Sequence, residues 1–175
     1  MIGYADAGYL SDTHNARSQT GFVFLHGGTA ISWKSSKQTL VSTSTNHSEI
    51  IALYEASCEC VWLRRMINNI QQSCGIGSIE APTIMYKDNA ACIVQMKTVY
   101  IKCNITKHIA PKLFYPHELQ KKNREINILR IKSNDNYADL FTKSLPATTF
   151  QKYIHGIGMR RLIDLQGSGG GLFLS

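Results

Sequence analysis

A long amphipathic helix is the sequence feature that most constrains how this chain folds. Apolar or small residues recur there in steps of three and four, which places them on one helix face: Leu53, Ala56, Cys60, Leu63, Ile67 and Ile70. The pattern predicts a helix that begins in the polar run after Ser42 and ends near Gln72, the longest in the chain. One face of this helix is expected to be buried, with the rest of the chain organised around it.

The start of this helix places a carboxylate where two roles are open. Asn46 can cap the helix, and Glu49 follows three residues later, as in a capping box. A capping role for Glu49 requires no chemistry. Alternatively, Glu49 lies at the mouth of a site, on the first turn of a rigid central helix.

Three further carboxylates lie where predicted elements end or begin. Asp6 ends a first strand, Asp88 ends a short strand, and Asp139 follows an apolar strand at residues 126–131. Mg²⁺ is a hard cation that prefers oxygen ligands, and two-metal phosphoryl-transfer sites gather several carboxylates. Each acid alone is better explained by a helix cap or a solvated loop end. Only the set indicates a metal site.

Size and composition are those of one soluble globular domain. The chain has 175 residues, of which 43% are hydrophobic and 18% charged. No apolar run approaches the roughly 18 residues that a membrane span requires, so no membrane partner is expected. The formal net charge of +7 favours an anionic partner, although a solvated basic surface without a ligand is the common alternative.

The cysteines indicate a reducing compartment. The five of them form neither an even disulfide framework nor a CxxC pair. Cys58 and Cys60 lie two apart in the helical pattern, so their side chains diverge and cannot share a zinc ion. We expect reduced thiols. Because Met1 also opens no basic-then-apolar leader, we expect a cytoplasmic or nuclear protein that is not secreted.

The order of predicted elements favours an α/β fold. Residues 1–6 predict a strand that lacks its beginning, residues 8–19 a polar connection, and residues 20–34 a hairpin that turns on Gly27-Gly28. A strand at 83–87 and a helix from Asn89 to about Met96 follow. Helical patterns at 107–122, 137–143 and 148–157 flank the strand at 126–131, and Pro116 is expected to kink or split the first of them. An antiparallel meander followed by alternating strands and helices predicts a mixed sheet covered by helices.

Several short motifs occur in one order and together resemble a known family. They are Gly3-Tyr4-Ala5-Asp6, Ser18-Gln19-Thr20-Gly21-Phe22-Val23-Phe24, Ala30-Ile31-Ser32-Trp33-Lys34, Lys37-Gln38, Asn46-His47-Ser48-Glu49-Ile50-Ile51-Ala52-Leu53, Trp62-Leu63-Arg64, Asp88-Asn89-Ala90-Ala91, Thr106-Lys107-His108-Ile109 and Ala138-Asp139-Leu140-Phe141-Thr142-Lys143. The ordered set resembles the ribonuclease H domain of copia-type retrotransposon Pol polyproteins, particularly those of plants. The resemblance covers roughly residues 3–160.

The resemblance implies both an architecture and a parent protein. The fold would be ribonuclease H-like, a five-stranded mixed sheet with helices on both faces and the long helix across it. The domain would span residues 1–160, with its first strand truncated at the N-terminus, and residues 161–175 would form a flexible tail. The chain would be a detached piece of a polyprotein whose reverse transcriptase segment is a partner.

The resemblance also implies an activity and a set of ligands. It implies two-metal hydrolysis of the RNA strand of an RNA/DNA hybrid with two Mg²⁺ ions, for which Mn²⁺ is a substitute. The four metal-binding and catalytic acids match Asp6, Glu49, Asp88 and Asp139. Asp6 would lie between the ions, Glu49 and Asp88 would hold one of them, and Asp139 would hold the other. With its three partners in place, Glu49 is favoured as a metal ligand.

Substrate contacts are expected beside these acids. Recognition of RNA requires a group that senses the 2′-OH, and Thr45, Asn46 and Asn89 carry suitable donors and acceptors, although helix capping explains them equally well. Basic candidates for phosphate contacts are Lys34, Lys37 and Lys107. His108 matches a family motif as an accessory residue, and a structural role is favoured for it.

Two other functions are open for such a chain. The first is a catalytically decayed retroelement remnant or nucleic-acid-binding module with the same fold. The second, a DNA-cutting transposase or integrase, is disfavoured because such enzymes normally use three acids and the motifs match the ribonuclease branch.

Overall fold

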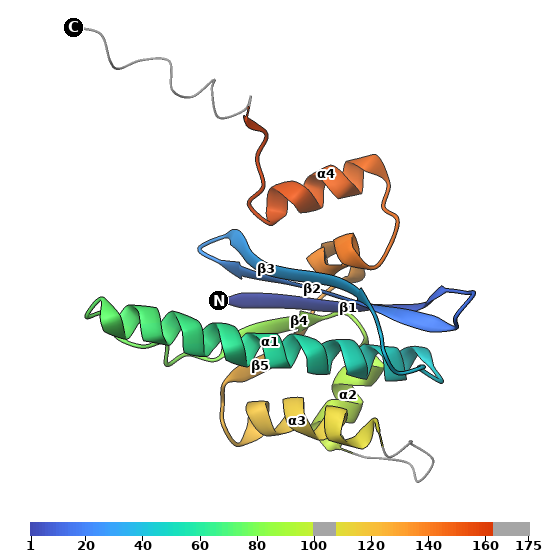
Figure 1. Cartoon of the computed structure of the whole chain (residues 1–175), viewed down its shortest axis with the longest axis horizontal. Helices are drawn as coiled ribbons and strands as arrows, with labels where there is room; N and C mark the ends of the chain where they lie inside the picture. The colour runs from blue at the N-terminus through green and yellow to red at the C-terminus, as the bar shows by residue number, and fades with distance from the viewer. Residues whose placement is uncertain (100–107, 163–175) are drawn as a thin grey trace, which may run out of the picture.

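The computed structural model describes residues 1–99 and 108–162, which form one mixed five-stranded sheet with helices on both faces (Figure 1). The strands are β1 (Ile2–Asp12), β2 (Arg17–His26), β3 (Thr29–Lys37), β4 (Thr83–Lys87) and β5 (Ile126–Arg130). The helices are α1 (Thr45–Ser73), α2 (Ala90–Thr98), α3 (Ala110–Lys121) and α4 (Ala147–Gly156), with 3₁₀ turns η1 (Ser133–Asp135) and η2 (Tyr137–Phe141). The predicted fold class is confirmed.

The sheet has the strand order β3-β2-β1-β4-β5, with β1 at its centre. The first three strands form an antiparallel meander, whereas β4 pairs parallel to β1 and β5 pairs parallel to β4. The turn between β2 and β3 uses Gly27 and Gly28 at φ of 58° and 80°, a conformation that favours glycine. Because β1 and β4 are parallel, the middle of β1 lies beside the carboxyl end of β4, which is where the site lies.

The first hairpin is longer than the sequence indicates. Most of the expected polar connection at residues 8–19 is strand, since β1 extends to Asp12 and β2 begins at Arg17. Beyond Gly8 the register shifts, and Ser18 Oγ accepts a hydrogen bond from the Leu10 amide. This arm is only partly buried, so its side chains lack the alternation that would mark it as strand. The six-residue first strand predicted from the sequence is therefore wrong in extent, because β1 has eleven residues.

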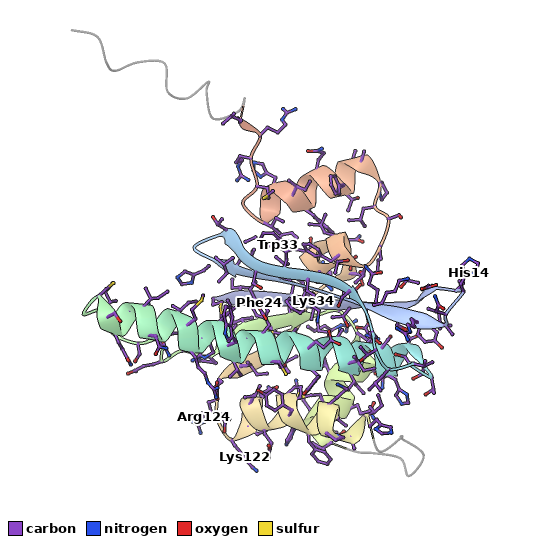
Figure 2. The ribbon with its side chains drawn as sticks, viewed as in Figure 1. His14, Phe24, Trp33, Lys34, Lys122 and Arg124 are labelled. Carbon is purple, nitrogen blue, oxygen red and sulfur yellow. The ribbon has the colours of Figure 1, made fainter. Side chains whose placement is uncertain are left out.

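Two apolar cores lie on opposite faces of the sheet. Helix α1 runs across one face, with α2 and α3 on the same side, while η2 and α4 cover the other face (Figure 1). Strand alternation assigns side chains to each side: Phe24 lies in the core under α1, whereas Trp33 lies on the α4 side of β3 (Figure 2). Side chains at the carboxyl end of a strand can therefore be approached by elements from either face.

Helix α1 begins within the expected polar run, but its cap is Ser44 and not Asn46. Ser44 has extended backbone angles, and its hydroxyl accepts a hydrogen bond from the His47 amide at 3.2 Å. Asn46 is therefore not the cap, and Glu49 is not the carboxylate of a capping box. The capping interpretation of both residues is wrong because Ser44 already occupies that position.

The remaining helices test two further expectations. Asn89 caps α2 by accepting a hydrogen bond from the Cys92 amide at 2.9 Å. Helix α3 is one helix of 12 residues with Pro116 inside it, so of the expected kink or split the split is wrong, and the kink stays a prediction. Pro116 is buried together with Leu113 and Leu119 against the neighbouring elements, and this packing offsets the missing backbone hydrogen bond.

Some sequence expectations concern residues outside the described ranges. Lys107 and nearly all of the expected tail at 161–175 lie there. The four cysteines that the structure describes, Cys58, Cys60, Cys74 and Cys92, are free thiols, as expected. Within the described residues, no helix is both long and apolar enough to cross a membrane.

Candidate metal centre

Two of the predicted acids meet because β1 and β4 are neighbouring parallel strands. Tyr4 on β1 is paired with Tyr86 on β4, so Asp6, within β1, and Asp88, just after the end of β4, lie side by side two residues further on. Alternation along both strands directs these positions toward the face covered by η2. Asp6 is also paired with Gly21 of β2, which brings a third strand to the site.

The third acid, Asp139, is delivered by η2, which packs directly on Gly21. A Cβ at Gly21 would lie 2.5 Å from Thr142 Cγ2 and 2.9 Å from the Ala138 carbonyl, so only glycine permits this approach. The Thr142 hydroxyl donates a hydrogen bond to Asp6 Oδ2. The close contact thereby places Asp139 beside the two strand ends.

Side chains of the meander fix the far end of η2. The Phe141 carbonyl accepts hydrogen bonds from Gln19 Nε2 at 2.9 Å and from Ser35 Oγ at 2.7 Å. At the near end, Asn136 caps η2 through Ala138 N and donates to the Ala5 carbonyl at 3.3 Å. These contacts hold the turn that carries Asp139 at both ends.

Asp6, Asp88 and Asp139 form a compact carboxylate cluster, with one oxygen from each lying within 4.8 Å of the others. Asp6 and Asp139 are buried, and Asp88 is half-buried. Asp88 Oδ1 is a buried acceptor without a hydrogen-bond partner among the described residues. Three converging carboxylates, one with an unsatisfied oxygen, fit the oxygen-ligand requirement of a divalent cation.

The electrostatics of the cluster agree with this fit. Burial, together with the neighbouring Asp6, raises the pKa of Asp139 to about 6, although Lys143 acts in the opposite direction. Lys143 Nζ lies 2.9 Å from Asp139 Oδ1 and 3.4 Å from Asp6 Oδ2. Its side chain is 42% exposed. Lys143 therefore neutralises part of the negative charge from the solvent side.

Glu49, the fourth predicted acid, is not part of this cluster. It enters from α1, on the opposite face of the sheet, and its carboxylate forms an ion pair with Lys87 Nζ. The structure thus brings three of the four predicted acids together and pairs the fourth with a lysine. Burial raises the pKa of the Glu49 carboxyl, and the Lys87 ammonium partly opposes that rise.

Lys87 is fully buried, with 0% of its side chain exposed. It follows Thr83 and Met85 on the face of β4 that packs under α1, and its Nζ also lies 3.4 Å from the Ala5 carbonyl. Burial alone lowers the pKa of Lys87, but Glu49, with further contributions from Cys92 and Asp6, raises it above its ordinary value. A permanent positive charge therefore sits beside the predicted catalytic glutamate.

The predicted 2′-OH contacts are placed in different ways. Thr45 is exposed at the first turn of α1. Asn46 donates through Nδ2 to Gln95 Oε1 of α2, which leaves its Oδ1 buried without a hydrogen-bond partner among the described residues. Asn89 uses its side-chain oxygen to cap α2. Of the three, Asn46 has a buried acceptor that is unsatisfied within the described residues.

The predicted phosphate-binding lysines are engaged on the surface. Lys34, on the α1 side of β3 (Figure 2), forms an ion pair with Glu55 at 3.0 Å. Lys37 forms one with Asp12 at 2.6 Å. His108 is exposed in the turn before α3.

Sequence reasoning missed the two lysines and Gly21. Lys143 lies four residues after Asp139, a spacing that brings such side chains together in a helical turn. Lys87 continues the alternation of Thr83 and Met85, which would have indicated burial. Gly21 gave no signal, since only the tertiary contact with η2 reveals its role.

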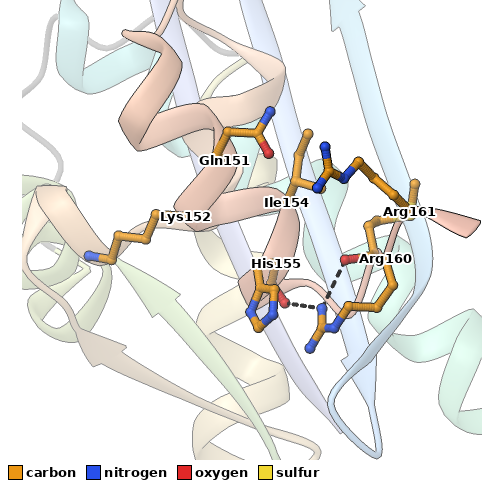
Figure 3. Close-up of a pocket in the computed structure, with 7 residues that line it drawn as sticks. Gln151, Lys152, Ile154, His155, Arg160 and Arg161 are labelled. Atoms are coloured by element: carbon orange, nitrogen blue, oxygen red, sulfur yellow. Dashed lines mark hydrogen bonds between the residues drawn. The ribbon is translucent and has the colours of Figure 1, made fainter. Parts of the chain in front are cut away.

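Basic side chains line several hollows in the described surface, two of which bear on the predicted site. One of about 390 Å³ opens beside Asp88 and is also lined by Arg130, Ile131, Lys132 and Ser133. The other, of about 620 Å³, lies against α4 and contains none of the four acids (Figure 3). Its cations are occupied: Lys152 bonds to Asp135, and Arg160 bonds to the carbonyls of His155 and Met159.

The chain is similar in sequence to retrotransposon Pol polyproteins and in structure to ribonuclease H domains. The chain is 32% identical over 159 residues, 91% of its length, to the retrovirus-related Pol polyprotein from transposon TNT 1-94 of Nicotiana tabacum. Its structure superposes on LC11-RNase H1 in complex with an RNA/DNA hybrid (TM-score 0.54, 16% identity, 81% of this chain and 92% of that one). It also superposes on the N-terminal RNase H domain of a Mycobacterium tuberculosis protein (TM-score 0.53, 18% identity, 88% and 95%).

The chain is a retrotransposon Pol homologue with the ribonuclease H fold. These findings confirm the resemblance that the ordered motifs predicted. The ribonuclease H-like domain spans about a tenth of the length of the TNT 1-94 polyprotein. No family model matches the chain.

Proposed function

We propose that this domain is a divalent-metal-dependent endonuclease of the ribonuclease H class, which hydrolyses the RNA strand of an RNA/DNA hybrid. The observation that carries the proposal is the cluster of Asp6, Asp88 and Asp139, with its unpartnered Asp88 oxygen, at the carboxyl edge of the sheet. The expected ion is Mg²⁺, with Mn²⁺ as a substitute, because both prefer oxygen ligands.

The three clustered acids would hold the ion, and Glu49 is the fourth predicted ligand. A bound divalent cation supplies a water of lowered pKa and stabilises the charge that develops on the leaving 3′ oxygen. Thr142 orients Asp6 through its hydrogen bond, and Lys143 balances the negative charge of Asp6 and Asp139. A mechanism with two ions further requires that Glu49 exchange its contact with Lys87 for a metal ion.

A hybrid substrate is supported by the acceptor on Asn46. A ribose 2′-OH is a donor that DNA lacks, and Asn46 Oδ1 is a buried acceptor without a partner among the described residues. Thr45, the residue before it, and Asn89 are further candidates. The structurally similar LC11-RNase H1 was solved with an RNA/DNA hybrid, which supports the same substrate class here.

Phosphate contacts would come from the basic residues around the acids. Arg130 and Lys132 line the hollow beside Asp88. Lys34 and Lys37 are further candidates because surface ion pairs are weak and can be exchanged for a phosphate. Lys107 and the accessory His108 remain predictions. Within a parent polyprotein, the reverse transcriptase segment would supply the hybrid to this domain.

A second candidate function is a nucleic-acid-binding module that cuts nothing. The observation that favours it is the buried ion pair of Glu49 with Lys87, which engages one of the four predicted catalytic acids.

One cleavage experiment tests both candidates. A hybrid, a duplex RNA and a duplex DNA of one sequence, labelled on either strand, are incubated with Mg²⁺, with Mn²⁺ or with EDTA. We expect metal-dependent cutting of the RNA strand of the hybrid, abolished in Asp88→Asn. Binding without cutting on any duplex would favour the second candidate, and cutting of duplex DNA at a comparable rate would contradict both.

A further inference from the structure

The buried lysine beside Glu49 bears on how many metal ions this site accepts. Glu49 and Lys87 meet between α1 and β4, where neither side chain is appreciably exposed. The Lys87 ammonium therefore lies where a cation bound by Glu49 would lie.

We propose that the Lys87 ammonium acts as a built-in cation for Glu49, so that the site binds one divalent ion at Asp6, Asp88 and Asp139 and not two. The proposal rests on the proposed function, in that it assumes that the carboxylate cluster binds a divalent metal.

Lys87 has no route by which to leave Glu49. It is 0% exposed, its Nζ lies 3.4 Å from the Ala5 carbonyl, and strand β4 fixes its backbone between β1 and β5. Separating the pair would leave a buried ammonium without a counter-charge, which is strongly unfavourable. An ion that approached Glu49 would therefore meet a positive charge that cannot withdraw.

Lys143 provides the contrast within the same site. It also pairs with predicted metal ligands, Asp6 and Asp139, but its side chain is 42% exposed. An exposed ammonium can move into water when a divalent ion arrives, and water compensates its charge. The Asp6 and Asp139 side of the site is thus open to an ion, whereas the Glu49 side is not.

The charge balance agrees with one ion. Four carboxylates carry four negative charges, which two divalent ions would neutralise. With the buried ammonium of Lys87 added, two divalent ions would leave an excess positive charge in a site of low dielectric. One ion plus Lys87 leaves one negative charge, which the exposed Lys143 can share.

The test is a count of bound Mn²⁺ on the full chain, by equilibrium dialysis and by titration calorimetry. We expect one Mn²⁺ per wild-type chain and two in Lys87→Met, which removes the charge and keeps an unbranched side chain of similar length. The second ion in Lys87→Met should appear in electron paramagnetic resonance as a spin-coupled pair that the wild type lacks. Two ions in the wild type would overturn the proposal while leaving the proposed metal-dependent function intact.

Matched variants assign the second ion to Glu49. Lys87→Met/Glu49→Gln should return to one ion, and Lys143→Met should stay at one. A single ion in a folded Lys87→Met, judged by circular dichroism, would contradict the role of Lys87. If Lys87→Met does not fold, Lys87→Gln replaces it, and the wild-type count still decides. No Mn²⁺ bound to the wild type would instead remove the metal site itself, and with it the proposed function.

Discussion

Two lysines contact carboxylates at the same edge of the sheet, but from opposite faces and in different surroundings. Lys143, on the η2 face, reaches Asp6 and Asp139 from solvent, whereas Lys87, under α1, holds Glu49 in the interior. The first ion pair can be exchanged for another cation at small cost, and the second cannot. The comparison shows that a carboxylate in the right motif is available to a metal only if its present partner is free to leave.

The largest effect is expected from removing a carboxylate from the cluster that Lys143 contacts. Asp6→Asn should lower hybrid cleavage by about a thousandfold or more, as for other residues that act as part of a catalytic unit. Folding should be retained, and without metal the melting temperature should rise because carboxylate repulsion is relieved. Gel assays and thermal melts measure the two effects. His108→Ala is the comparison variant and should retain far more activity, so equal losses would contradict the assignment.

The free energy of unfolding of the metal-free protein should depend on pH through Asp139, which lies on the Lys143 side of the comparison. The pKa of Asp139 is raised to about 6 in the folded protein, above the ordinary value of 3.8. The folded state therefore takes up this proton first, so stability should increase as pH falls from above 6 toward 4, by up to about 3 kcal/mol. Asp139→Asn lacks the group and is the control. Urea unfolding of both proteins in EDTA at pH 7.5 and 4.5 measures how the free energy of unfolding changes with pH. An equal change in the wild type and in Asp139→Asn would contradict the prediction.

A third prediction concerns the contact that places Asp139. Gly21→Ala should reduce the free energy of unfolding by about 1–3 kcal/mol, because its Cβ would overlap Thr142 and Ala138. Cleavage should fall as well, since η2 must move away from Asp6. Gly77→Ala is the matched control: nothing lies within 4 Å of its added Cβ, and its stability should be nearly unchanged. Urea denaturation of both variants measures the effect, which equal stabilities would refute.

Asn46 tests substrate choice apart from metal binding. Asn46→Ala should reduce hybrid cleavage about five- to tenfold, the worth of roughly one hydrogen bond, without changing the number of bound ions. Ser44→Ala, which removes the true cap of α1, should instead lower stability by about 1 kcal/mol and leave hybrid preference unchanged. The ratio of cleavage rates on hybrid and on duplex RNA distinguishes a loss of substrate recognition from a loss of stability. The same ratio in Asn46→Ala and Ser44→Ala would show that Asn46 affects cleavage only by stabilising helix α1.

The smallest effect is expected from the exposed lysine. Lys143→Met should tighten Mn²⁺ binding about two- to fivefold, in keeping with the modest energy of an exposed ion pair. Titration calorimetry measures the affinity. Weaker binding in this variant would indicate that Lys143 supports the ion and does not compete with it.

The sequence predicted the periodic parts of the fold and failed where burial was partial. Helix α1, the β2–β3 hairpin and β4 were recognisable because their apolar residues alternate or recur. The end of β1 was not, since residues 8–12 show no clear apolar alternation and are only partly buried while the strand is still paired with β2. The continuity of α3 through Pro116 depended on packing that local patterns do not contain.

The site was predicted in the same uneven way. The motifs predicted four acids, of which the structure brings three together, and the parallel pairing of β1 with β4 places Asp6 beside Asp88. The partner of Glu49 was not predicted, because Lys87 lies 38 residues away and a lysine beside an aspartate at a strand end is ordinarily solvent-exposed. The alternation with Thr83 and Met85 indicates the buried side of β4, but only the packing of α1 on β4 shows that Lys87 meets Glu49 there.

The central position of β1 also has a consequence for synthesis on the ribosome. β1 can pair with β2 as soon as the first hairpin emerges, but its other edge waits for β4, more than seventy residues later in the chain. Until then α1 lies over a half-sheet with an open hydrogen-bonding edge, the kind of surface on which nascent chains associate wrongly. The same delay separates Glu49 from Lys87 and Asp6 from Asp88 and Asp139. Metal binding by a ribosome-released chain therefore reports that β4, β5 and η2 have all docked, and translation pauses before residue 83 are expected to favour aggregation over activity.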